Sequence, residues 1–252
     1  MSKHLIYMLA KIEYGRISKS KFNEGRDKII EDLRKDFPHV QHVKKSHTYR
    51  FEFKAEGVPE VVTDTDPVLS LLSSNKAWGI RISPGAIILH TKKYEGFTNF
   101  HERLLGLLKR VHDIFNITHL SFVGMRFVNN FDYDPNTEFS EYFERLDFLQ
   151  PTLNSWGRGG SNMTARYGMD TESITINSGV LMNAPKYLPD LMEFASDLFE
   201  GNNFREGIFA HLDIDSFYYT KELVDFNFDF VSEKTQVLRN NANAAFFDII
   251  KV

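Results

Sequence analysis

Cysteine is missing from this chain of 252 residues. Without it there is no disulfide framework and no thiolate nucleophile, and zinc could be bound only through histidine and carboxylate ligands. Long apolar runs are missing as well, so no segment is predicted to cross a bilayer as a helix. Near the amino terminus, Lys11 and Glu13 interrupt the apolar residues before a signal sequence could be completed. We therefore expect a cytoplasmic protein with no membrane segment, long enough to bury a core without covalent cross-links.

Signature motifs of the common enzyme classes are also lacking. The chain has no G-x-S-x-G elbow, no HExxH helix and no kinase signature. The loop from Leu153 to Ser161 is rich in glycine, but no Gly-Lys-Ser/Thr closes it, which argues against a triphosphate-binding loop. Its amides could form an anion-binding nest with Arg158 and Arg166, beside Trp156. The more usual interpretation is a flexible surface loop anchored by that tryptophan.

Net charge is small, but the charged residues are unevenly distributed along the chain. The formal net charge is −4, from 30 Lys and Arg against 34 Asp and Glu. Residues 1–54 nevertheless hold 13 Lys and Arg against 7 Asp and Glu. Solvated surface charge is the ordinary explanation of such an excess. The alternative is a basic patch that includes Lys44, Lys45 and Arg50 and binds a phosphate-bearing partner such as nucleic acid.

The pattern of residues 77–134 predicts the unit around which the fold is organised. Strands at Trp78–Ser83 and Ala86–Lys93 flank a Pro-Gly turn, as in a hairpin. Apolar residues then recur every three or four positions over 97–115, which predicts a helix capped by Thr98. A long strand over 118–131 follows, and we expect it to be central in its sheet because the hairpin and the helix both need an apolar platform.

The remaining periodicity predicts strands and helices in mixed order, with antiparallel hairpins rather than regular βαβ units. In chain order these are a strand at 4–14, a helix capped by Ser20 that ends before Pro38, a strand at 44–54, a short strand near 58–62 in an otherwise irregular segment, a short helix at 138–146, strands at 162–169 and 172–182, a helix from Pro189 to 199, a strand at 205–219 and a closing amphipathic helix.

This element order predicts an α+β fold, with a largely antiparallel sheet and helices packed on one face. Residues 1–116 and 117–252 each run strand, helix, several strands, helix. The halves could therefore be an internal duplication within one compact unit.

One histidine and two carboxylates are candidate metal ligands. His211, Asp213 and Asp215 alternate along a predicted strand, so their side chains share one face. With a fourth ligand they could bind a divalent cation. A half-solvated strand shows the same alternation, and we expect Asp213 and Asp215 to serve folding instead, by pairing with Arg126 or Arg166. Arg126 itself lies among apolar neighbours, where an arginine generally finds a carboxylate partner.

Two short motifs carry a resemblance to a known family. Tyr94–Phe100 (YEGFTNF) followed by Gly124–Asn129 (GMRFVN) resembles the pairing typical of a sporadically distributed bacterial family of hypothetical proteins. The strand Leu212–Asp215 (LDID) and an amphipathic final helix with aromatic residues near its end are similar too. That helix has Val237 and Leu238 where the family often has Leu-His. The resemblance implies an accessory protein of a mobile or defence-associated gene module, with no established reaction.

The sequence thus supports two functional hypotheses. The first is a non-enzymatic binding protein, without a cofactor, that acts on a partner protein or nucleic acid. The second is a metal-dependent phosphodiesterase or nuclease that uses His211, Asp213 and Asp215.

Overall fold

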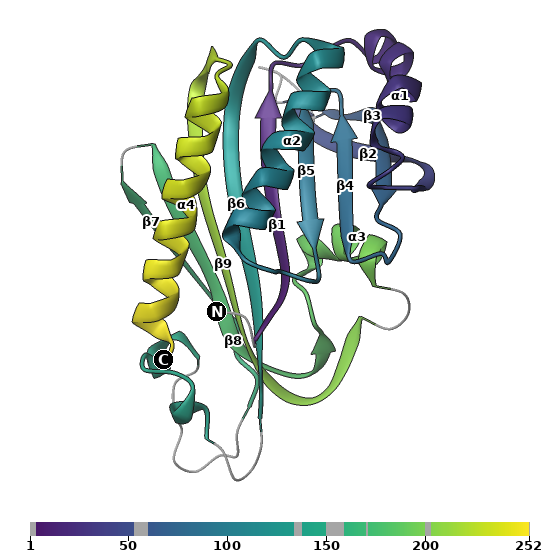
Figure 1. Ribbon diagram of the computed structural model, residues 1–252. Helices are drawn as coiled ribbons and strands as arrows, with labels where there is room; N and C mark the ends of the chain where they lie inside the picture. The colour runs from purple at the N-terminus through teal and green to yellow at the C-terminus, as the bar shows by residue number, and fades with distance from the viewer. Residues whose placement is uncertain are drawn as a thin grey trace.

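The computed structural model describes residues 4–52, 60–133, 138–149, 159–169, 171–199 and 203–251, and the side chains of 42–64 and 169 lie outside that description. Within these residues the chain forms a nine-stranded sheet and four α-helices, which confirms the α+β class (Figure 1). The strands are β1 Leu5–Tyr14, β2 His39–Glu52, β3 Glu60–Leu72, β4 Trp78–Ser83, β5 Ala86–Thr91, β6 His119–Asp132, β7 Met163–Met169, β8 Glu172–Pro185 and β9 Phe204–Asp225. The helices are α1 Lys19–Leu33, α2 Phe97–Phe115, α3 Pro189–Leu198 and α4 Phe228–Ile249, with short 3₁₀-helices at Phe139–Glu141 and Leu146–Phe148.

The sheet is antiparallel throughout and has the strand order β2-β3-β4-β5-β1-β6-β9-β8-β7. Strand β6 lies between β1 and β9, so the prediction of a central long strand is confirmed. Each half of the chain forms a contiguous half of the sheet. The two halves meet where β1 pairs with β6.

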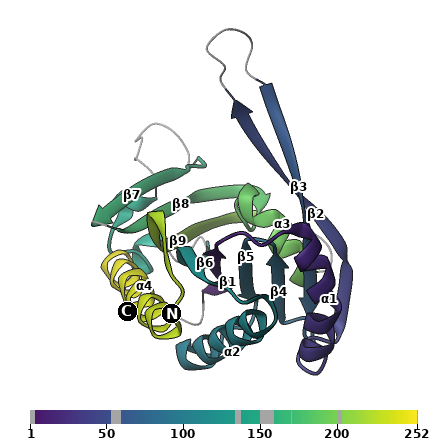
Figure 2. The ribbon, with the colours of Figure 1, turned by 90° about the horizontal axis from the view of Figure 1, so that it is seen from above.

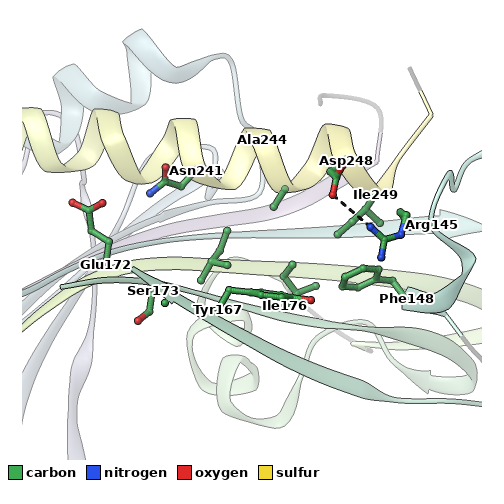
Figure 3. Close-up of a pocket in the computed structure, with 13 residues that line it drawn as sticks. Arg145, Phe148, Tyr167, Glu172, Ser173, Ile176, Asn241, Ala244, Asp248 and Ile249 are labelled. Atoms are coloured by element: carbon green, nitrogen blue, oxygen red, sulfur yellow. Dashed lines mark ion pairs between the residues drawn. The ribbon is translucent and has the colours of Figure 1, made fainter. Parts of the chain in front are cut away.

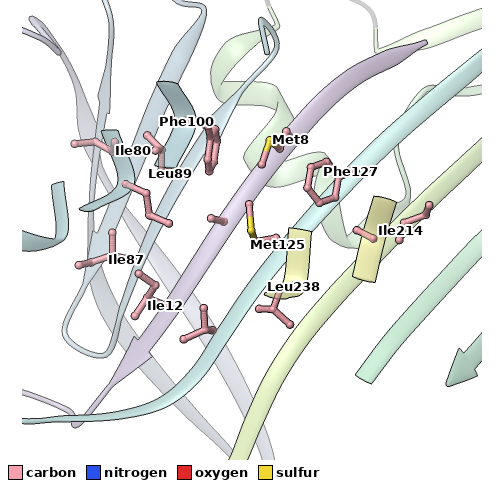
Figure 4. Close-up of a cluster of buried hydrophobic side chains, with 14 of the residues drawn as sticks. Met8, Ile12, Ile80, Ile87, Leu89, Phe100, Met125, Phe127, Ile214 and Leu238 are labelled. Atoms are coloured by element: carbon pink, nitrogen blue, oxygen red, sulfur yellow. The ribbon is translucent and has the colours of Figure 1, made fainter. Parts of the chain in front are cut away.

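Both faces of the central strands are buried, because side chains alternate between them. On β1, Met8, Ala10 and Ile12 belong to the main apolar core, while Tyr7 and Leu9 belong to a second, smaller core. Figure 4 shows the main core, where side chains of β1, β4, β5, β6 and β9 meet Phe100 of α2 and Leu238 of α4.

Helices α1, α2 and α4 cover the main core, and α3 covers the second one on the opposite side of the sheet (Figure 2). Leu191, Ala195 and Leu198 form the apolar stripe of α3, at intervals of four and three residues. The expectation that the helices pack on one face therefore applies to α1, α2 and α4 but not to α3, which packs on the opposite face. No helix in the described ranges is long and apolar enough to cross a membrane.

Several predicted helix boundaries are wrong in detail. Ser18, not Ser20, caps α1, since its hydroxyl accepts a hydrogen bond from the Lys21 amide at 3.2 Å. Helix α2 begins after Gly96 without a side-chain cap, so Thr98 is not its cap. The helix expected at 138–146 is replaced by the two 3₁₀-helices, each only three residues long.

Strand β3 is the largest departure from the predicted elements. Its thirteen residues replace the short strand expected near 58–62. Pro67 favours a loop interpretation because proline lacks the amide that a sheet ladder uses. In the structure, β4 borders β3 only along Leu69–Leu72, so Pro67 lies where β2 is the only neighbouring strand. A proline is tolerated at such a half-paired position.

Candidate functional site

Arg126 and Asp213 form a buried ion pair between β6 and β9. The Nε of Arg126 lies 2.9 Å from Oδ1 of Asp213, and Nη2 lies 2.7 Å from Oδ2. The Asp213 side chain has no exposed surface and that of Arg126 is 10% exposed. The expectation that Arg126 pairs with a carboxylate is confirmed. Two parallel hydrogen bonds of this kind give the pair a fixed geometry.

The same arginine reaches helix α3. Its Nη1 donates a hydrogen bond to Oδ2 of Asp190 at 2.5 Å, and Nη2 lies 3.3 Å from Oδ1. Burial by itself would lower the pKa of Arg126, but its hydrogen bonds with Asp213 and Asp190 outweigh that effect and raise the pKa above its ordinary value. Arg126 is therefore a permanent cation that joins the sheet to the start of α3.

A second buried arginine, Arg81 of β4, holds the other end of α3. Its Nε lies 2.6 Å from Oδ2 of Asp197, and its Nη1 lies 2.6 Å from Oε1 of Glu193. Its Nη2 also donates to the Glu193 carbonyl at 2.8 Å, and Ser70 donates to Asp197 at 3.2 Å. The ring of Phe194 covers the guanidinium at 4.9 Å.

Sequence reasoning missed this second pair. Two features could have indicated it. Arg81 stands between Ile80 and Ile82 in a mostly apolar strand. Asp190, Glu193 and Asp197 recur every three or four residues on one helix, which places three carboxylates along one side.

The candidate metal ligands share one face of β9, as predicted, but they do not form a ligand set. Both oxygens of Asp213 accept hydrogen bonds from Arg126. Burial lowers the pKa of His211 to about 4, so its ring is neutral near pH 7. Burial raises the pKa of Asp215 to about 6. Across the described ranges, no group of three or more His, Cys, Asp or Glu side chains is arranged to hold a metal ion.

Of the other predicted binding residues, only Arg166 has a described side chain. Arg166 is exposed on β7, and its guanidinium lies 5.2 Å from the ring centroid of Phe217 rather than beside an aspartate. Lys44, Lys45 and Arg50 belong to β2, but their side chains lie outside the described ones. Trp156 and Arg158 lie outside the described residues altogether.

An apolar groove runs between α4 and the β7–β8 hairpin (Figure 3). It has a volume of about 470 Å³, and its floor and walls include Ile174 and Ile176 of β8 and Ala244 of α4. The groove exists because the helical layer ends at α4, whereas the sheet continues for two more strands.

Ion pairs stand at both ends of this groove. At one end Arg145 lies 3.7 Å from Asp248. At the other end Lys234 donates a hydrogen bond to Glu172 at 2.7 Å. No pattern in the sequence indicates the groove, since its lining comes from three separate segments of the chain, within 145–148, 167–176 and 241–249.

Comparison with known proteins identifies no family for this chain. No family model matches this chain, and no curated protein matches it. The resemblance carried by Tyr94–Phe100 and Gly124–Asn129 therefore stays a prediction, and the function has to be argued from the geometry described above.

We predict that Asp213→Asn destabilises the fold and has no specific effect on metal binding. The substitution leaves the buried Arg126 with one charged partner that is largely in solvent, and breaking a buried pair costs about 3 to 5 kcal/mol. Urea denaturation in buffer with chelator measures the loss. The matched control is Asp190→Asn, because the Asp190 side chain is 61% exposed and a pair at such a position contributes about 1 kcal/mol or less.

The opposite result would support a metal site. In that case Asp213→Asn matches the parent in chelator and loses only a stabilisation that manganese gives to the parent, because native-state ligands raise stability by mass action.

Asp215 gives a prediction about pH. Its pKa is near 3.9 in an unfolded chain and about 6 in the fold, so folding favours the protonated carboxyl. This contribution to stability is complete below about pH 4 and is lost as the pH rises through about 6. We expect the stability of the parent relative to Asp215→Asn to fall by at most about 3 kcal/mol over that range and then to level off. Urea denaturation of both proteins at stepped pH measures the difference, and a constant difference contradicts the assignment.

Proposed function

We propose that this chain is a non-enzymatic binding protein that holds an amphipathic helix of a partner protein in the groove beside α4. The observation that carries the proposal is the uncovered apolar strip of the sheet along β7 and β8. The partly exposed Ile174 and the exposed Tyr167 line it, Ile176 is buried at its floor, and no helix in the described ranges other than α4 beside it lies over it. A sheet face with an apolar surface requires a covering layer, and three helices already provide one for the neighbouring strands.

The chemistry of the groove supports a helix as the occupant. Ala244 and Ala245 on α4 are small, so another helix could approach α4 closely while resting on Ile174 and Tyr167. The ion pairs at the two ends suit the polar flanks of an amphipathic helix. Apolar anchors three and four residues apart, set into a groove, are a recurring way of recognising such helices.

The wider role is part of the same proposal. The resemblance to the sporadically distributed bacterial family supports an accessory component of a mobile or defence-associated gene module, acting in the cytoplasm. A binding protein fits this role because an accessory component works by bringing other components together.

We also propose that the fold arose by internal duplication. In both halves the first strand pairs with the last strand of that half, as β1 with β5 and β6 with β9. From this pair the remaining strands of each half follow toward the edge of the sheet in reverse chain order. In each half, a helix on the main-core side comes directly after the last strand in the chain. Strand β2, α1 and α3 have no such simple counterparts, since the second half has one strand fewer, two 3₁₀-helices in place of α1, and α3 between β8 and β9.

A charge placed in the groove tests the proposed function. Ala244→Glu puts a carboxylate into the apolar strip, and Asn240→Glu puts the same charge on an exposed position of α4 that does not line the groove. We expect affinity capture from the native host, read by mass spectrometry, to retain one protein with the parent and with Asn240→Glu. The same protein is at least tenfold depleted with Ala244→Glu, since desolvating an unpaired charge is unfavourable by more than about 1.4 kcal/mol.

Equal recovery with the two variants contradicts the groove as the binding site. Recovery of no protein by the parent, above an unrelated bait, contradicts the binding function itself. Both positions are exposed, so neither variant is expected to unfold the chain.

A further inference from the structure

A row of aromatic rings lies on the α3 side of the sheet, beyond the part that α3 covers. Phe122 of β6 is opposite Tyr219 of β9, and Phe217 is two residues before Tyr219 on the same face. The rings of Phe122 and Phe217 stack with centroids 5.7 Å apart and an angle of 22° between their planes. Tyr219 is 53% exposed.

Gly124 makes room for this stack. It is the direct cross-strand neighbour of Phe217, and a Cβ at this position would lie 2.6 Å from the Phe122 ring. With any other residue at this position the Phe122 ring would have to shift. The two rings therefore lie over the backbone of β6 with part of their surface open to solvent, since both residues are only partly buried.

Cations stand at both ends of the stacked rings. Lys11 of β1 places its ammonium 5.6 Å from the Phe122 ring centroid. Arg166 of β7 places its guanidinium 5.2 Å from that of Phe217. The order across the sheet is thus cation, ring, ring, cation, at separations where a cation and a ring face attract each other. No described element covers this row, which lies on the side of the sheet away from α4 and its groove.

We propose that this row binds single-stranded nucleic acid, with bases on the rings and phosphates at Lys11 and Arg166. Open aromatic rings on a sheet are a general platform for unpaired bases, because every base has a flat face that can stack. The flanking cations supply the charge that a phosphate backbone requires. A duplex does not fit this chemistry, because its bases are already stacked on one another.

One carboxylate limits the affinity. Glu13 lies 2.5 Å from Lys11 and neutralises it, so phosphate binding requires the lysine to leave Glu13. Removing this competitor should therefore tighten binding. Asp215 also lies on this face, two residues before Phe217, and burial raises its pKa to about 6, which reduces its negative charge below that pH.

Fluorescence anisotropy with labelled single strands of about 12 nucleotides, one DNA and one RNA, tests the proposal. The parent should bind at low salt, and the affinity should fall as salt increases from about 50 to about 200 mM. Tyr219→Ala should weaken binding about tenfold, which corresponds to the loss of one stacked base. Arg166→Gln should reduce the slope of log affinity against log salt concentration by an amount that corresponds to about one phosphate contact. Glu13→Gln should increase the affinity.

The matched control is Tyr167→Ala. Tyr167 is 52% exposed, nearly the same as Tyr219, but it lies on the opposite face of the sheet and lines the groove beside α4. This variant and Ala244→Glu should bind nucleic acid like the parent, so failure of the groove proposal and failure of this one can be told apart. Tighter binding of RNA indicates use of the 2′-hydroxyl, and equal binding indicates stacking and phosphate contacts alone; both support the proposal.

Three results would overturn it. The first is the absence of saturable binding to either strand at low salt. The second is an equal loss with Tyr219→Ala and Tyr167→Ala. The third is that the parent binds no nucleic acid but captures a host protein, and that Tyr219→Ala no longer captures this protein. That result would assign this face to a protein partner.

Discussion

Two buried arginines determine how the second face of the sheet is used. Arg81 and Arg126 lie on β4 and β6, and each bridges the sheet to carboxylates of α3. A buried guanidinium is stable only when its charge is compensated by well-placed acceptors. The carboxylates of α3 meet that requirement, so the position of the helix follows from the charges beneath it as much as from its apolar stripe.

This arrangement gives the two faces of the sheet different properties. The main-core face is covered by α1, α2 and α4 through apolar contacts, and among the described residues it is left open along β7 and β8, beyond α4. On the other face α3 is short, ten residues, and its apolar stripe packs with Tyr7 and Leu9 of β1, Ile88 of β5 and Val128 of β6. The row of Phe122, Phe217 and Tyr219 lies farther along β6 and β9, past Arg126 and Asp213, where no described element covers it. The two proposed binding surfaces are thus the places where the covering helices end.

The sequence predicts the strand and helix pattern well where the periodicity is local. The hairpin of β4 and β5, the central position of β6 and the amphipathic helix α4 follow from apolar residues at regular intervals. Strand β3 is predicted far too short because Pro67 signals a loop, and nothing in the sequence shows that its ladder is paired only with β2 there. Local patterns describe one element at a time, whereas a strand tolerates a proline only where no neighbouring strand needs the missing amide.

The candidate site could be predicted only in part, for a similar reason. The pairing of Arg126 with Asp213 follows from the rule that a buried charge needs a partner. Placement of Asp190, Glu193 and Asp197 against both arginines depends on which face α3 covers, and that is a property of chain topology. The stacking of Phe122 on Phe217 depends on the register of β6 and β9. Residues far apart in sequence come together only through such pairings.

The central claim is that charge pairing fixes α3 on the sheet, and a double-mutant cycle between Arg81 and Asp197 tests it most directly. We predict that Arg81→Met and Asp197→Leu each lower the free energy of unfolding by about 3 to 5 kcal/mol, because each leaves a buried charge without its partner. The double variant should be more stable than either single variant, since two apolar side chains replace the pair. Additive losses, with the double variant the least stable of the three, would contradict the account.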